Sequence, residues 1–139
     1  MVRVETDVSF LNSLANSDDV RPFIRPDGAA LDFAPIAGKR MTEIGGVVLS
    51  NGSDAAAIFD MTADGVFQSH TLFGPTCRGR RAIEQAREFV GWMFDHGARV
   101  LWGSTPRDNA KARWFNRQIG ARVIGGDDAD ELFEIRKAA

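Results

Sequence analysis

The sequence predicts a single α/β domain in which an antiparallel group of strands precedes alternating helices and strands. Short apolar segments follow one another between residues 30 and 73, and the dipeptides Asn51-Gly52 and Asp64-Gly65 between them are typical of hairpin turns. After Phe73 the hydrophobic period changes, because apolar residues begin to recur at the spacing of a helix. A chain of 139 residues suits one compact domain, expected to span residues 1–139.

The first part of the chain is expected to form a strand, a helix and a meander. Val2–Glu5 alternates apolar and charged residues like a strand, and Asp7 or Thr6 can cap a helix that runs to about Ser17. A further helical turn after Ser17 has to stop before Pro22, because the residue before a proline avoids helical geometry. The strands of the meander are expected at Ala30–Ile36, Ile44–Ser50, Ala55–Met61 and Val66–Phe73.

The second part begins with the strongest helical pattern of the sequence. From Arg81 to His96 the apolar residues lie on one side of a helix, and Gly97 marks its end. A strand at Arg99–Ser104 follows, and Asp108 or Asn109 can cap the next helix. That helix ends before Gly120, and the last two strands are expected at Arg122–Ile124 and Leu132–Arg136.

Composition excludes several classes of protein. Hydrophobic residues make up 44% of the chain and no apolar run approaches the roughly 20 residues of a membrane-spanning helix, so a soluble, cytoplasmic protein is expected. No signal peptide is expected either, because the first residues do not combine a basic and an apolar segment. The lone Cys77 excludes an internal disulfide framework, and two histidines argue against a multi-histidine metal site. No metal is therefore expected.

The net charge of −2 hides an uneven distribution. Residues 78–122 carry ten Lys or Arg against four Asp or Glu, whereas residues 1–77 and 123–139 are both acidic. Fourteen of the 17 basic residues are arginine, whose planar guanidinium suits phosphate. The basic segment indicates either a local site for an anion or a solvated helical face.

The loop between Phe73 and Ala82 favours the anion site. A strand ends there, two glycines follow, and a long helix begins without Ser, Thr, Asp or Asn at its expected cap position. A phosphate or pyrophosphate could accept hydrogen bonds from the first N–H groups of this helix and pair with Arg78, Arg80 and Arg81. Backbone carbonyls or water could also cap the helix, and the arginines would then face solvent.

The same stretch resembles the GNAT superfamily of acyl-CoA N-acyltransferases. That family places Arg/Gln-x-x-Gly-x-Gly/Ala between a central strand and the helix that binds the CoA pyrophosphate, and this chain has Arg78-Gly79-Arg80-Arg81-Ala82-Ile83 there. Arg81 stands where the family has glycine, and Ile83 where it has a small residue. The resemblance implies that the pyrophosphate is held by Arg78, Gly79, Arg80, Arg81 and Ala82.

A second motif supports the resemblance. Asn109, Ala112, Phe115 and Gly120-Ala121 follow the family pattern Asn-x-x-Ala-x-x-Tyr-x-x-x-Gly-Phe, with one additional residue before the glycine. The resemblance implies that Asn109 contacts the pantetheine arm, although it can equally be a plain N-cap. It also implies that the backbone of Leu72 and Phe73 pairs with pantetheine like an added strand.

The catalytic groups match the family less well. Phe115 occupies the position of the tyrosine that protonates the departing CoA thiolate in family enzymes, and the chain contains no tyrosine. Loss of one acid or base group typically costs about 10²–10⁴-fold in rate. His70 is the leading candidate for the base that takes a proton from the amine, because histidine titrates near neutral pH. Glu43 and Asp60 on neighbouring strands are weaker candidates.

Two functions follow from these patterns. The first is an N-acyltransferase that moves an acetyl group from acetyl-CoA to an amine of unknown identity, on a twisted mixed sheet of six to eight short strands flanked by about four helices. The second is a catalytically silent GNAT-fold protein that serves in assembly, such as a tailed-phage virion component, with the surface around Trp92 as a candidate contact. Homo-oligomers fit either function, whereas nucleic-acid binding is disfavoured because no aromatic stacking platform accompanies the basic segment.

Overall fold

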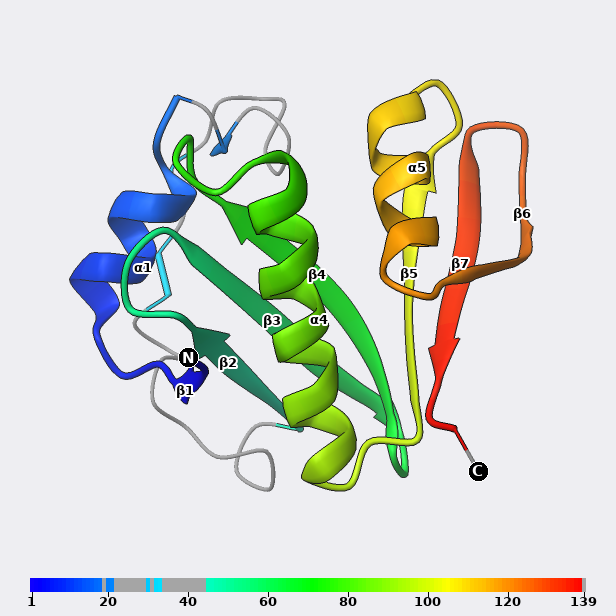
Figure 1. Ribbon diagram of the computed structural model, residues 1–139, viewed down its shortest axis with the longest axis horizontal. Helices are drawn as coiled ribbons and strands as arrows, with labels where there is room; N and C mark the ends of the chain where they lie inside the picture. Colours follow the sequence, from blue (N-terminus) through cyan, green and yellow to red (C-terminus); the bar gives the residue numbers. More distant parts are fainter. Residues whose placement is uncertain (19, 22–29, 31, 34–44, 139) are drawn as a thin grey trace.

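The computed structural model describes residues 1–18, 20–21, 30, 32–33 and 45–138, and within them it contains one seven-stranded mixed sheet and three helices (Figure 1). Along the sheet the strand order is β1-β2-β3-β4-β5-β7-β6. In chain order the elements are β1 (Arg3–Val4), α1 (Val8–Ala15), β2 (Gly46–Ser50), β3 (Ala55–Ala63), β4 (Val66–Phe73), α4 (Gly79–Asp95), β5 (Val100–Pro106), α5 (Ala110–Gln118), β6 (Arg122–Gly126) and β7 (Asp130–Arg136). The predicted α/β class and the number of strands are confirmed.

Most predicted elements occur close to their expected bounds, and the differences have local causes. The long helix α4 begins at Gly79 rather than Arg81, because Gly79 adopts a φ of 58°, which lets the chain turn directly into the helix. The caps are Asp7 and Asn109, whose side chains accept hydrogen bonds from the backbone N–H groups of Phe10 and Ala112. The strand predicted at Ala30–Ile36 and the helical turn after Ser17 lie largely or partly outside the described residues.

Opposite faces of the sheet are covered by different helices. On one face, Phe89 and Met93 of α4 pack with Leu49, Phe67 and other apolar residues of the central strands. On the other face, Leu11 of α1 belongs to a second apolar cluster that includes Leu72 of β4. Because side chains alternate between the two faces of a strand, His70 lies on the same face as Leu72, as the sequence predicts.

The sheet is divided at its centre. Strands β4 and β5 run parallel and pair only through Val66↔Val100, Phe67↔Leu101 and Gln68↔Trp102. Beyond Gln68 the strands separate, with α4 on one side of the gap and α5 on the other (Figure 1). Residues 69–73 of β4 therefore have no β5 residue paired beside them.

The second half of the sheet, β5-β7-β6, is covered by α5. Gly103 of β5 leaves room for the ring of Phe133, since a Cβ at this glycine would lie 2.7 Å from the ring. Polar contacts hold α5 in place, because Arg113 bonds Glu131 at 3.1 Å and the Asn116 amide donates to Thr105 Oγ1 at 2.9 Å. No residue of α5 is fully buried, so these polar contacts supplement its apolar packing.

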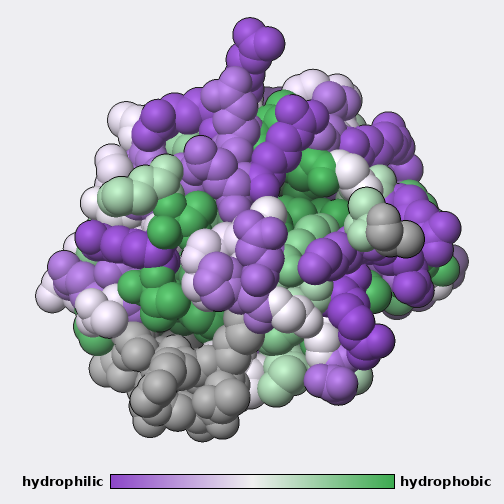
Figure 2. All heavy atoms as spheres, turned by 60° about the horizontal axis from the view of Figure 1, so that its bottom comes forward, coloured by the Kyte–Doolittle hydropathy of each residue, from purple (hydrophilic) through white to green (hydrophobic). Residues whose placement is uncertain are grey.

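Hydrophilic side chains cover much of the face seen in Figure 2, with apolar side chains visible between them. The Trp92 ring is half-buried, packs against the main core cluster and stacks on His96 with ring centroids 3.7 Å apart. These contacts favour a packing role for Trp92 over a partner surface. No described helix combines the length and apolar character needed to cross a membrane.

A buried carboxylate fixes the loop before α4. Asp54, 7% exposed, accepts hydrogen bonds from Thr76, Asn51 and, through two nitrogens of the guanidinium, Arg81. Burial alone raises the pKa of Asp54, but these hydrogen bonds and the charge of Arg81 outweigh it and lower the pKa to about 2. Its backbone carbonyl also accepts from Gly74, so this one residue joins the β2–β3 turn to both ends of the loop.

We expect Asp54→Asn to lower the free energy of unfolding at pH 7 by about 2 kcal/mol, from the difference between a pKa of about 2 and the ordinary 3.8. A carboxyl whose pKa is lower in the folded than in the unfolded protein stabilises the fold when the pH is above its pKa in the unfolded protein. This stabilisation is lost as the pH falls through its pKa in the folded protein. The difference between wild type and variant should therefore shrink from about pH 4 towards pH 2. Urea unfolding between pH 7 and pH 2 measures this difference in the free energy of unfolding, and Asp95→Asn, a change at an exposed residue, is the control. A difference that does not change with pH would contradict a stabilising ion pair between Asp54 and Arg81.

Candidate functional site

A cleft of about 580 Å³ lies where β4 separates from β5, between the start of α4 and the first turns of α5. Both apolar and basic side chains line it. The lining residues are Val20, Thr71, Phe73, Cys77, Arg78, Gly79, Ala82, Asn109, Lys111, Ala112, Trp114 and Phe115. Residues separated by up to 95 positions in the sequence thus meet at one site.

The cleft brings together five of the nine residues predicted from the sequence. Phe73, Arg78, Gly79, Ala82 and Asn109 line it. The other four do not, and they are His70, Leu72, Arg80 and Arg81. The two motifs that carry the resemblance therefore converge, but not every residue within them faces the same space.

The mouth of the cleft is positively charged. Arg78 is the N-cap residue of α4 and provides no side-chain hydrogen bond to the helix, as expected from the sequence. The first N–H groups of α4 consequently lack a side-chain acceptor from this residue, and the positive end of the helix dipole lies beside Arg78 and Gly79. Lys111, in the first turn of α5, adds an ammonium group from the other wall. This arrangement can bind phosphate groups.

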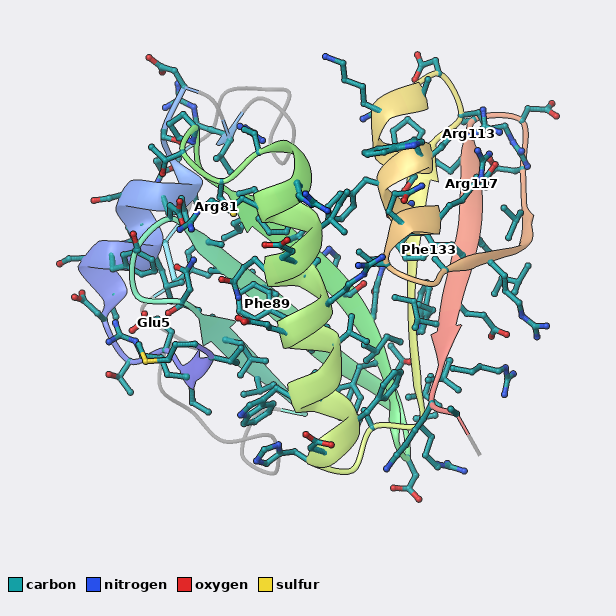
Figure 3. All side chains as sticks on the ribbon, in the orientation of Figure 1. Glu5, Arg81, Phe89, Arg113, Arg117 and Phe133 are labelled. Atoms are coloured by element: carbon teal, nitrogen blue, oxygen red, sulfur yellow. The ribbon has the colours of Figure 1, made fainter. Side chains whose placement is uncertain are left out.

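The remaining arginines of the motif have other contacts. Arg81 pairs with Asp54 and lies on the side of α4 turned away from α5 (Figure 3). There it lines a smaller polar hollow of about 270 Å³ with Asn51 and Gln85. The Arg80 side chain is 92% exposed and pairs with Glu84 one helical turn later.

The unpaired edge of β4 offers backbone groups to the opening. The Gly74 N–H donates to Asp54 O across the β3–β4 ladder, and in an antiparallel ladder alternate residues face the partner strand. Leu72 belongs to the set that faces β3, so its backbone is directed away from the opening. The backbone groups of Thr71 and Phe73 face the opening, which places the expected added-strand contact at Thr71 and Phe73 rather than at Leu72 and Phe73.

Aromatic rings form the apolar wall of the cleft. The rings of Phe73 and Phe115 meet edge to face with centroids 5.5 Å apart, and Trp114 is half exposed beside them. Cys77 is fully buried at the base, where burial, followed by the negative charge of Asp54, raises the pKa of its thiol. Its sulfur is therefore protonated at neutral pH.

Asn109 serves as an N-cap and also lines the cleft. Its Oδ1 accepts the hydrogen bond from Ala112 N–H at 3.1 Å, which is the capping role weighed in the sequence. The amide group of a capping asparagine retains two N–H donors. The two roles considered for Asn109 are thus compatible.

His70 lies across the sheet from the cleft. It is on the α1 face of β4, two residues beyond the last pair with β5, and its side chain is 47% exposed. Its Nε2 is 3.3 Å from Oδ2 of Asp60 on β3. Glu43, the other candidate base, lies outside the described residues.

Sequence reasoning missed several cleft residues. Lys111 and Trp114 reach the cleft because the β4–β5 gap places α5 beside α4, and Thr71 reaches it because it lies on the part of β4 that has no paired β5 residue. A signal existed for Lys111, since it follows the Asn109 cap and helix N-termini commonly face anions. Among the described residues, no group of three or more His, Cys, Asp or Glu side chains could hold a metal ion.

Comparison with known proteins identifies the fold. No family model and no curated protein sequence matches the chain. Solved structures do match over nearly its whole length. The GNAT domain of PAT from S. lividans has a TM-score of 0.78 and 18% identity over 98% of this chain and 89% of its own.

Two further structures agree. PaiA N-acetyltransferase from Thermoplasma acidophilum, in complex with coenzyme A, has a TM-score of 0.73 and 13% identity over 99% of both chains. The ribosomal-protein-alanine N-acetyltransferase of Brucella melitensis has a TM-score of 0.68 and 13% identity, also over 99% of both chains. The chain therefore has the fold of the GNAT acetyltransferases.

Proposed function

We propose that this protein is an N-acetyltransferase that uses acetyl-CoA and an amine acceptor. The observation that carries the proposal is the cleft at the β4–β5 opening, which has a basic mouth at the start of α4 and an aromatic wall. Coenzyme A has a matching form, with phosphates at one end and a long, weakly polar pantetheine arm at the other. The acetyl-CoA and CoA complexes of proteins with this fold support the assignment.

The residues of the cleft divide into three tasks. Arg78, Lys111 and the first N–H groups of α4 bind the phosphates. The exposed backbone of Thr71 and Phe73 hydrogen-bonds the pantetheine amides in the manner of an added strand, with the Asn109 amide beside it. Phe73 and Phe115 exclude water along the arm.

Acetyl-CoA supplies a thioester whose carbonyl carbon is attacked by the amine nitrogen, so that a C–N bond forms and the C–S bond breaks. His70 lies on the face of β4 opposite the cleft, on the part of the strand that has no paired β5 residue. His70 takes the proton that the amine loses. The sulfur leaves with the bonding electron pair and takes a proton from water, since Phe115 carries no acidic hydrogen.

A catalytically silent assembly protein is the second candidate. Phe115 in place of a proton donor, and the engagement of Arg81 by Asp54, favour it. The two candidates differ in turnover: an enzyme releases CoA from acetyl-CoA, whereas a silent relative that keeps the cleft binds CoA without consuming acetyl-CoA.

We expect CoA at 100 times its Kd to raise the thermal unfolding midpoint by several degrees, since a ligand of the native state then adds about 2.7 kcal/mol. Arg78→Ala and Lys111→Ala should each weaken CoA binding about tenfold, because each removes one charge-assisted contact to phosphate. Thermal unfolding with and without CoA measures the shift of the midpoint, and calorimetric titration measures the Kd of CoA for the wild type and the two variants. Lys137→Ala is the matched control, because the Lys137 ammonium bonds the Phe94 carbonyl instead of lining the cleft. Absence of CoA binding to the wild type would refute the proposed function.

We expect Phe115→Tyr to raise the rate of thiol release from acetyl-CoA about tenfold, because a phenol at the cleft can protonate the departing sulfur. The Phe115 ring is half-buried and lines the cleft. A thiol-reactive dye follows the reaction, and the Kd for CoA should change little. An unchanged rate with intact CoA binding would show that protonation of sulfur from this position does not limit turnover.

A further inference from the structure

We propose that Asp60 is a positioning residue that holds the His70 imidazole with its Nδ1 free to accept the proton of the amine. The inference rests on the proposed N-acetyltransferase function and adds a second residue beside His70, the proposed general base. The contact that carries it is the 3.3 Å approach of His70 Nε2 to Asp60 Oδ2.

The two side chains are placed by a regular stretch of the β3–β4 ladder. Asp60 pairs with Gln68 and Ile58 pairs with His70, so Asp60 and His70 are diagonal neighbours on one face of the β3–β4 ladder. The register is unbroken from Ala55 to Met61, and the irregularity begins only after Met61. Backbone pairing alone therefore brings the carboxylate to the imidazole.

The contact with Asp60 favours one tautomer of His70. An ionised carboxylate only accepts hydrogen bonds, so the imidazole nitrogen beside it, Nε2, carries the proton. The lone pair is then on Nδ1, which is the nitrogen left to act as a base. In this arrangement the carboxylate orients the imidazole, as an aspartate orients the catalytic histidine in hydrolytic triads.

The His70 side chain is about half exposed. On its own strand its same-face neighbours are Gln68 and Leu72, and on β3 its direct partner is Ile58, so Asp60 is the charged group nearest to it in the ladder. No β5 residue is paired with His70, because the parallel pairing stops at Gln68. The imidazole thus lies on the part of β4 that has no β5 partner, on the face of the sheet opposite the cleft.

Side-chain hydrogen bonds hold this part of the opening in place. The Ser69 hydroxyl donates to Trp102 O at 3.3 Å across the point where the strands separate. The Trp102 indole N–H donates to Thr62 Oγ1 at 3.0 Å and connects β5 to β3. The backbone that carries His70 is therefore anchored next to the point where β4 and β5 separate.

The first test needs no turnover. The chain has two histidines, so long-range ¹H–¹⁵N spectra resolve both rings, and His96, whose Nδ1 bonds the Trp92 carbonyl, is an internal reference. We expect neutral His70 to be the Nε2–H tautomer in the wild type. In Asp60→Asn it should shift towards the Nδ1–H tautomer, because the amide can donate to Nε2. A His70 tautomer that is mixed in the wild type, or unchanged in the variant, would overturn the proposal.

The second test compares two charge removals on one hairpin. Asp60→Asn should lower thiol release from acetyl-CoA, with water as the nucleophile, about tenfold, and His70→Ala about 100-fold. Asp64→Asn, at the tip of the same hairpin, should leave the rate unchanged. Because Asp60 does not line the cleft, the KM for acetyl-CoA should stay constant. Both aspartates are exposed, so the variants are expected to fold.

The outcomes separate the inference from the function on which it rests. Equal rates for Asp60→Asn and Asp64→Asn, with His70→Ala impaired, would remove Asp60 from the mechanism and leave the acetyltransferase intact. CoA binding by the wild type with thiol release no faster than in buffer would refute the catalytic role of both residues. Failure of the wild type to bind CoA would refute the proposed function itself.

Discussion

The three residue pairs that join β4 to β5 are the constraint on which the rest of the structure depends. Among the described residues they are the only sheet contact between the meander and the C-terminal strands, and they end at Gln68 and Trp102. If the pairing continued to Phe73, β5 would occupy the edge of β4 and no opening would exist. Because it stops, two helices flank a gap in the sheet, and the cleft lies in that gap.

Such a gap needs support, since an unpaired strand edge inside a sheet leaves backbone groups without partners. Three contacts span it in addition to the strand pairs. The ring of Phe115 on α5 packs on Phe73 of β4, and the Ser69 hydroxyl bonds the Trp102 carbonyl. Farther along, the Arg87 guanidinium of α4 donates to the Gln118 carbonyl at the end of α5. Apolar and polar contacts thus set the separation of the two halves.

Local signals in the sequence predicted the elements well. Asn51-Gly52 and Asp64-Gly65 marked the hairpins because their glycines adopt positive φ, and the apolar stripe of α4 defined the longest helix. Contacts between residues that are distant in the sequence could not be predicted from it. The pairing of Arg81 with Asp54 spans 27 positions, and the direction of the Leu72 backbone depends on the β3–β4 register. Lys111 and Trp114 were missed because nothing in their own segment shows that α5 faces α4.

The network around Asp54 has a consequence for the energetics of recognition. Glycine-rich loops that bind anions often become ordered only when the ligand arrives, and the lost conformational entropy then weakens the affinity. Here the loop between β4 and α4 is already tied to the β2–β3 turn through Gly74, Thr76 and Arg81. The pairing of Arg81 with Asp54 thus orders this loop before any ligand binds, which reduces that entropic penalty. Association then requires little more than diffusion into a preformed site.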